Sequence, residues 1–145
     1  MPGHSRSIEV VREWVLKAEN DFTNAVHTLK LKEKCPTDTV CFHAQQAVEK
    51  YLKALLVFKN LDFRKTHDIC ELMAALPQEL QPELSGSEQD LLTDYATETR
   101  YPGIYEPITL SEARKAVALM KRACKQIRAS LPKEALLKEK LIPLV

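Results

Sequence analysis

Apolar residues return at alternating steps of three and four along most of this sequence, which is the spacing of one face of an α-helix. The first such stripe predicts a helix that begins at Ile8 and ends near residues 34–36. Its members are Ile8, Val11, Val15, Ala18, Phe22, Ala25 and Leu29. No segment alternates in the way that a half-buried strand does. The sequence therefore predicts an all-α fold.

Further stripes follow the first one along the chain. They predict helices over about 38–60, 66–76, 87–96 and 109–131, and a short C-terminal helix from Pro132 that carries Leu136, Leu137 and Leu141. Capping residues mark most of the predicted starts: Thr37 or Asp38, Asp68 with Glu71, Ser87 with Asp90, and Thr109 with Glu112. No long linker separates these segments, so 1–145 is interpreted as one domain with a core at about 8–130 and an extension at 131–145. The expected architecture is an up-and-down antiparallel bundle of about five helices.

Glycine content and charge exclude several kinds of ligand site. The chain has three glycines, which are not clustered, and a net charge of +1. Glycine-rich phosphate loops of the P-loop and dinucleotide types need clustered glycines, so both are excluded. Bulk electrostatics predict neither a nucleic-acid nor a membrane partner, and any such partner would need a local patch.

The cysteines indicate whether the chain binds a metal, and the N-terminus indicates its cellular location. The four cysteines form no C-x-x-C pair, and Cys35, Cys41 and His43 lack the spacing and the fourth ligand of a zinc site. We expect no metal and no cofactor. The N-terminus is polar and no apolar run approaches the roughly 18 residues of a membrane span, so a cytoplasmic protein is expected.

The second predicted helix carries the most distinctive polar residues. His43, Gln46, Lys50 and Lys53 are three, four and three residues apart and therefore share a face, and Glu49 stands four residues before Lys53. From spacing alone, a solvated helix face with an ordinary ion pair is favoured over a ligand site. Trp14, Val57, Phe58 and Leu61 lie outside the main stripes and are candidates for sealing a dimer.

Three motifs together resemble the HEPN domain family. They are F-H-A-Q-Q-A-V-E-K-Y-L-K-A-L-L at 42–56, T-H-D-I-C-E-L at 66–72 and R-Y-P at 100–102. The resemblance covers roughly residues 8 to 130. It implies a bundle of about five helices, commonly a homodimer and named for proposed nucleotide binding. It also implies a minimal nucleotidyltransferase as a partner, in a pair of the toxin–antitoxin type.

The resemblance also supplies the candidate site residues. It implies a nucleotide- or phosphate-binding surface made of His43, Gln46, Lys50, Lys53, His67 and Arg100. The two lysines and Arg100 are expected to cooperate there in binding an anion. From its position alone, His67 is better interpreted as satisfying backbone groups beside the cap of the third helix.

Many relatives resemble metal-independent ribonucleases with an R-x(4–6)-H motif. All four histidines here precede Arg100, and the motif position holds Tyr105 instead. If the chain is an enzyme, Arg100 and Tyr105 are its candidate catalytic residues. A phenol is a poor base at neutral pH, so we expect little or no ribonuclease activity.

The preferred interpretation is thus a HEPN-like module directed at a nucleotide or a nucleic acid. The alternatives are a metal-independent endoribonuclease that uses Arg100, and a purely structural dimerisation bundle.

Overall fold

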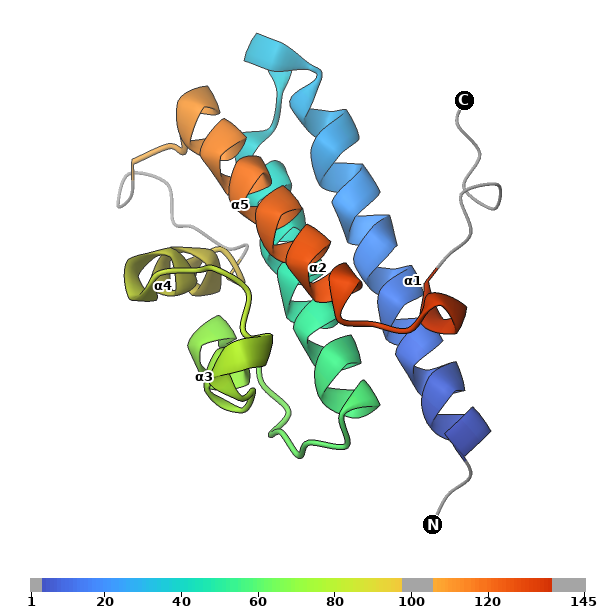
Figure 1. Ribbon diagram of the computed structural model, residues 1–145. Coiled ribbons are helices and arrows are strands. Elements are labelled where there is room, and N and C mark those ends of the chain that lie inside the picture. The colour runs from blue at the N-terminus through green and yellow to red at the C-terminus, as the bar shows by residue number, and fades with distance from the viewer. Residues whose placement is uncertain (1–3, 98–105, 137–145) are drawn as a thin grey trace.

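The computed structural model describes residues 4–97 and 106–136, and their side chains from Ile8 onward. Its helices are α1 (His4–Leu29), α2 (Thr37–Phe58), α3 (Ile69–Ala74), α4 (Gly86–Asp94) and α5 (Leu110–Ala129), with 3-10 turns at Lys32–Lys34, Gln78–Leu80 and Lys133–Ala135. No strand occurs within these ranges. The predicted all-α fold is confirmed (Figure 1).

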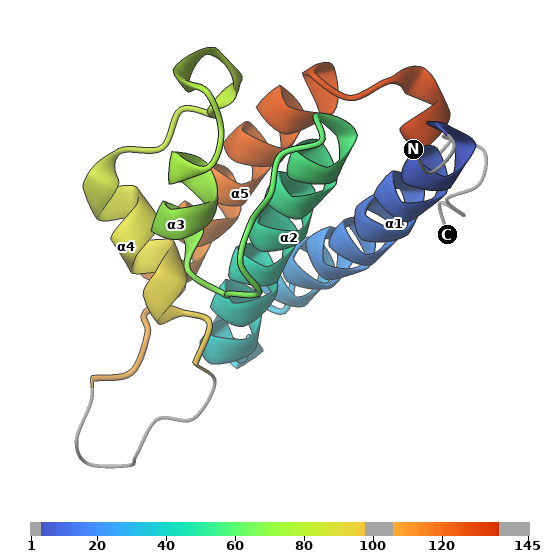
Figure 2. The same cartoon turned by 90° about the horizontal axis from the view of Figure 1, so that it is seen from below.

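Helix α2 lies at the centre of the bundle. It packs against both α1 and α5. Helices α3 and α4 lie on the side of α2 that is away from α1 (Figures 1 and 2). Every residue from Tyr51 to Leu56 is buried. Helix α2 is therefore enclosed along its C-terminal half, and any charged group there must find a partner inside the protein.

The predicted apolar stripes form the core. On α1, the side chains of Val11, Val15, Ala18 and Ala25 are fully buried. On α5, the buried set is Ala113, Ala116, Val117, Met120, Ala123, Cys124 and Ile127. The side chains singled out for a dimer seam, Trp14, Val57, Phe58 and Leu61, are partly buried and pack against this core.

The predicted bounds of α1 are wrong at both ends. The helix begins at His4 rather than Ile8, and it ends at Leu29 rather than near residues 34–36. Lys32 has a φ of 55°, which is left-handed backbone that an α-helix does not contain. A 3-10 turn over Lys32–Lys34 therefore follows α1 as a separate element.

The predicted caps are only partly correct. Asp68 accepts hydrogen bonds from the backbone N–H groups of Cys70 and Glu71, which confirms the cap of α3. Helix α2, in contrast, has no side-chain cap, because its N-cap residue is Pro36, and the hydroxyl of Thr37, the first residue of the helix, donates to the Ile108 carbonyl at 2.7 Å. The predicted caps, Thr37 and Asp38, are instead the first two residues of the helix.

The caps of the last two α-helices also agree only in part with the predictions. Ser85, not Ser87, caps α4, in a reciprocal capping box with Glu88. Thr109 caps α5 as predicted, but Glu112 bonds the Tyr95 hydroxyl instead of returning to the Thr109 backbone.

The C-terminal end of the described chain adds little regular structure beyond α5. The segment after Pro132 forms a 3-10 turn over Lys133–Ala135 rather than the predicted helix. Leu137 and Leu141 lie outside the described residues. None of the described helices is long and apolar enough to cross a bilayer.

The end of α2 positions the segment that leads to α3. Asn60 has a φ of 56°, and the Leu61 N–H donates to the Leu56 carbonyl at 2.9 Å, as in a Schellman cap. The chain leaves the helix here and brings His67 back beside Glu49, in the middle of α2. The predicted exit at Asn60 is confirmed.

Candidate functional site

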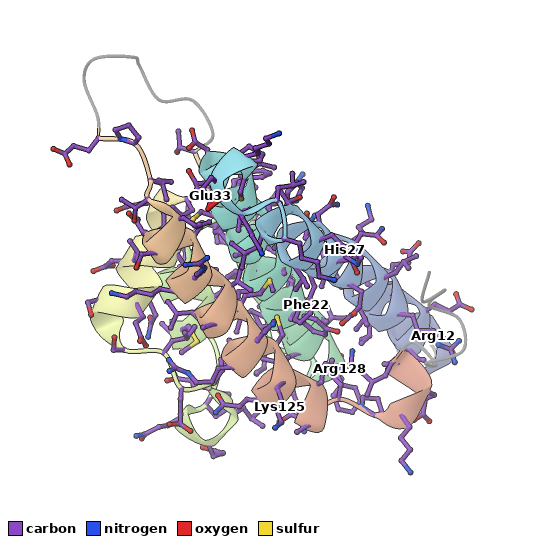
Figure 3. The ribbon with its side chains drawn as sticks, turned by 90° about the horizontal axis from the view of Figure 1, so that it is seen from above. Arg12, Phe22, His27, Glu33, Lys125 and Arg128 are labelled. Atoms are coloured by element: carbon purple, nitrogen blue, oxygen red, sulfur yellow. The ribbon has the colours of Figure 1, made fainter. Side chains whose placement is uncertain are left out.

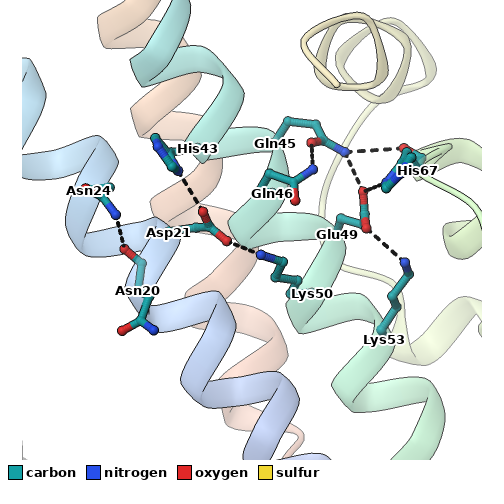
Figure 4. Close-up of polar contacts among 10 residues, drawn as sticks. All are labelled: Asn20, Asp21, Asn24, His43, Gln45, Gln46, Glu49, Lys50, Lys53 and His67. Atoms are coloured by element: carbon teal, nitrogen blue, oxygen red, sulfur yellow. Dashed lines mark hydrogen bonds and ion pairs between the residues drawn. The ribbon is translucent and has the colours of Figure 1, made fainter. Parts of the chain in front are cut away.

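A carboxylate from α1 joins two of the predicted site residues on α2. Asp21 Oδ1 lies 2.7 Å from His43 Nδ1, and Asp21 Oδ2 lies 2.6 Å from Lys50 Nζ (Figure 4). The exposed fractions of these side chains are 10% for Asp21, 24% for His43 and 22% for Lys50. The group therefore forms a half-buried polar cluster between α1 and α2.

A second carboxylate, Glu49, organises the other side of the same surface. Its oxygens lie 2.8 Å from Lys53 Nζ, 2.9 Å from Gln45 Nε2 and 2.9 Å from His67 Nδ1. Burial acts to raise the pKa of Glu49, but the hydrogen bonds from Lys53, Gln45 and His67 outweigh it and the pKa is lowered. Glu49 is therefore a carboxylate at neutral pH.

Two adjacent glutamines tie the surface together. Gln45 is fully buried, and its amide nitrogen donates to Glu49 and, at 3.3 Å, to the His67 backbone carbonyl. Its amide oxygen accepts from Gln46 Nε2 at 2.7 Å. Among the described residues, no buried side-chain nitrogen or oxygen lacks a hydrogen-bond partner. The Gln-Gln pair thus fixes His67 to α2.

Both histidines are oriented in the same way. Each turns Nδ1 toward a carboxylate that also holds a lysine. An ionised carboxylate is only an acceptor, so Nδ1 carries a proton and Nε2 is the ring atom left for a ligand. The side chain of His67 is 71% exposed even though its partner Glu49 is 3% exposed. A buried acid thus presents an accessible imidazole.

The structure divides the predicted binding residues between the two carboxylates. His43 and Lys50 meet at Asp21, whereas Lys53 and His67 meet at Glu49 (Figure 4). Lys53 is not solvated: its side chain is 7% exposed, and its Nζ lies 5.3 Å from the centre of the Trp14 ring. Arg100 and Tyr105 lie outside the described residues.

Asp21 and Gln45 were missed by the sequence reasoning. The Glu49–Lys53 pair was visible from its spacing of four residues, although its burial was not. Nothing in the sequence marks Asp21, because its role depends on how α1 docks on α2. The burial of Gln45 follows only from the return of the chain to His67.

A separate polar network joins three helices of the bundle. The Tyr51 hydroxyl of α2 bonds Glu19 of α1, and Arg128 Nη1 of α5 donates to Glu19 at 2.9 Å and to the Tyr51 hydroxyl at 2.8 Å. Figure 3 shows Arg128 on the side of α5 that faces α1. This network has no accessible imidazole, and we interpret it as structural.

Within the described residues, no group of three or more His, Cys, Asp or Glu side chains is arranged to hold a metal ion. The imidazole, amide and ammonium groups of the α2 surface are able to transfer protons and to bind anions.

Comparisons with known proteins agree with the all-α fold. The chain is similar to TT1696 from Thermus thermophilus, a crystal structure with 27% sequence identity and a TM-score of 0.69 over 83% of this chain and 98% of that one. It shares its fold with ST0689, an archaeal HEPN homologue, at 24% identity and a TM-score of 0.63 over 82% and 95% of the two chains. No curated protein sequence matches. The HEPN domain model matches residues 11–129, so the chain belongs to the HEPN domain family.

Proposed function

We propose that this chain is a nucleotide-directed HEPN module that binds a phosphate group on the polar side of α2. The observation that carries the proposal is the shared orientation of His43 and His67, each held through Nδ1 by a buried carboxylate. Their Nε2 atoms, the amide of Gln46 and the ammonium of Lys50 are the groups that would contact the phosphate.

The lysines have different tasks in this proposal. Lys50 is 22% exposed and supplies positive charge at the edge of the surface. Lys53 balances the charge of Glu49, which would otherwise repel an anion bound at His67. Each carboxylate is matched by one lysine, so a protonated histidine adds net positive charge where the phosphate would bind. Arg100 is proposed as a further contact, because a guanidinium binds two phosphate oxygens at once.

We also propose that the chain works as a homodimer with a minimal nucleotidyltransferase, in a pair of the toxin–antitoxin type. Membership of the HEPN family supports this partnership. Light scattering tests the dimer, and co-purification with a nucleotidyltransferase encoded beside this chain tests the partner. Growth arrest by this chain alone, relieved by the partner, tests the toxin–antitoxin role.

A structural bundle without a ligand is the second candidate function. It is favoured by the internal pairing of Lys50 and Lys53, which satisfies both ammonium groups without a phosphate. In that case the polar side chains of α2 serve to fix α1 and the segment before α3.

Titration of ATP and of inorganic phosphate, followed by isothermal calorimetry, distinguishes the two candidates. The His43→Gln/His67→Gln variant is expected to bind ATP at least about tenfold more weakly than the wild type, because it loses two charge-assisted hydrogen bonds. Lys30→Gln is the control, since Lys30 is an exposed residue with no ion pair among the described residues. Equal ATP binding by all three proteins, or no binding by the wild type, would favour the structural bundle.

A further inference from the structure

Helix α5 carries a concentration of positive charge that the near-zero net charge conceals. Its 20 residues include six Lys or Arg side chains and one acidic residue, Glu112. The whole chain has 21 Lys and Arg against 20 Asp and Glu, so the rest holds 15 basic (21 less six) and 19 acidic side chains (20 less one). The local patch that a polyanionic partner would need is therefore present on one helix.

The cations occupy the outward side of α5. The apolar side of the helix is buried in the core, and it contains Val117, Met120 and Ile127. Arg114, Lys121 and Lys125 are all exposed, and their steps of seven and four residues put them in one line along the helix. Figure 3 shows Lys125 on α5. We name Arg114, Lys121 and Lys125 the α5 stripe.

Two of the three cations beside the stripe are paired, whereas the stripe is not; the third, Lys115, is exposed and has no ion pair among the described residues. On one flank, Arg122 donates to Glu88 Oε1 at 2.9 Å and to the Glu83 carbonyl at 3.1 Å. On the other flank, Arg128 is paired with Glu19. Among the described residues, no ion pair involves any member of the stripe. The acidic residues near α5 thus leave its central cations open to solvent.

From this arrangement we infer that the α5 stripe is a docking surface for the sugar–phosphate backbone of a nucleic acid, contacted without base readout. Arg114 and Lys125 are 11 residues apart, which corresponds to about 16 Å along a helix. Nucleic-acid strands present a phosphate every few ångströms, so a row of cations of this length reaches several of them. On the line between Arg114 and Lys121 the exposed residue is Ala118, whose methyl group makes no hydrogen bond to a base edge.

The composition of the surface favours a nucleic acid over other polyanions. A membrane-bound helix lays an apolar face into the lipid, but the apolar face of α5 is buried against the bundle. A protein interface usually has aromatic or large apolar side chains at its centre, and the exposed non-charged side chains of α5 include Ala118 and Ala129. A surface that binds the sugar–phosphate backbone by charge alone needs neither an exposed apolar face nor aromatic side chains.

The α5 stripe is independent of the proposed phosphate site. That site lies on α2 between α1 and the segment that carries His67, with α5 behind α2 in Figure 4. The inference therefore goes beyond the proposed function, and either can fail without the other.

The salt dependence of oligonucleotide binding tests the inference. The probes are two single-stranded RNA oligonucleotides of unrelated sequence, and fluorescence anisotropy gives the binding constant at several salt concentrations. We expect the wild type to bind both RNAs alike, with a dissociation constant of about 10⁻⁴ to 10⁻⁶ M at physiological salt. Each phosphate contact contributes about 0.7 to the magnitude of the slope of log K against log salt concentration. In the Arg114→Gln/Lys121→Gln/Lys125→Gln variant, the magnitude of this slope is therefore expected to fall by about 2.

A matched variant removes the same charge elsewhere. Lys30, Lys34 and Lys59 are exposed and lie outside α5, so Lys30→Gln/Lys34→Gln/Lys59→Gln is expected to keep the wild-type slope. Circular dichroism melting establishes that both triple variants are folded, and glutamine preserves helix propensity on α5.

Three results would overturn the inference. One is an equal reduction of the slope in both triple variants, which would mean that only net charge matters. Another is an unchanged slope in the α5 variant, or no RNA binding by the wild type. The third is a loss of binding to polyglutamate or to anionic phosphatidylserine vesicles in the α5 variant while RNA binding is retained, which would assign the stripe to an acidic protein or a membrane.

Discussion

Lys53 Nζ lies 2.8 Å from Glu49 Oε2, one helical turn away on α2, and the two side chains are 7% and 3% exposed. A charged pair at this depth gives up its hydration, and its mutual attraction offsets that cost only where further hydrogen bonds are made. Gln45 and His67 supply those bonds to Glu49. The pair is thus the inner support of the exposed imidazole of His67.

Replacement of Glu49 by glutamine is expected to destabilise the protein by about 3 kcal/mol, because it leaves the Lys53 ammonium buried without a countercharge. The measurement is the free energy of unfolding in urea. Glu71→Gln is the control, since Glu71 pairs with the exposed Arg64 at the surface and its removal should barely move the midpoint. Equal effects of the two substitutions would contradict the buried pair.

The stabilising effect of Glu49 is expected to disappear in acid. The pKa of Glu49 is lowered from its ordinary value of 4.5, so the folded state favours the carboxylate. Its contribution is present above 4.5 and is lost as the pH falls through the lower, folded-state pKa. The stability difference between the wild type and Glu49→Gln should shrink between pH 5 and pH 3. A difference that stays constant over this range would exclude the linkage.

Tyr51 and Tyr95 are expected to resist ionisation in the folded protein. Burial, followed by hydrogen bonds to Glu19 and Glu112 respectively, raises the pKa of each phenol far above its ordinary value of 10.0. Unfolding then releases protons, so stability should fall as the pH rises above 10.

Absorbance at 295 nm measures tyrosine ionisation, and we compare its pH titration in the wild type and in Tyr51→Phe. The variant should keep the native titration of the wild type unchanged and lose one of the four tyrosine contributions in concentrated urea. A smaller native step in the variant would show that Tyr51 ionises in the folded state.

The cap of α4 can be located by two alanine substitutions. Ser85→Ala should cost about 1 kcal/mol, because Ser85 accepts from the Glu88 N–H and completes a reciprocal capping box. Ser87→Ala, at the position that the sequence favoured, should cost clearly less. Urea unfolding measures both, and the reverse order would restore the cap to Ser87.

Ribonuclease activity is expected to be weak or absent. General acid–base assistance contributes about 10²–10⁴-fold when the group has a pKa near the working pH, and the motif position holds Tyr105 rather than a histidine. Cleavage of single-stranded RNA without metal is compared for the wild type, Arg100→Ala and Tyr105→His. Strong wild-type activity that Arg100→Ala abolishes would make the chain an enzyme. Activity in Tyr105→His alone would show that the wild type lacks ribonuclease activity because the imidazole is missing.

The sequence by itself determined the all-α fold and most of the core. Apolar side chains at steps of three and four define a helix face through local geometry alone, so Val11, Val15 and Met120 were found in the core as predicted. Local signals also located the Asp68 cap, the exit of α2 at Asn60 and the Glu49–Lys53 pair. In each case the interacting groups are within a few residues of one another.

Only the tertiary structure decided which groups meet across the bundle. Asp21 reaches His43 over 22 residues, and Glu19 reaches Arg128 over 109 residues. Such pairs depend on how two helices dock, which a local sequence pattern does not predict. The same reason explains why the hydrogen bond from Thr37 to Ile108 could not be predicted. The cations of α5 are visible in the sequence, but the pairing of Arg122 and Arg128 follows from where Glu88 and Glu19 come to lie.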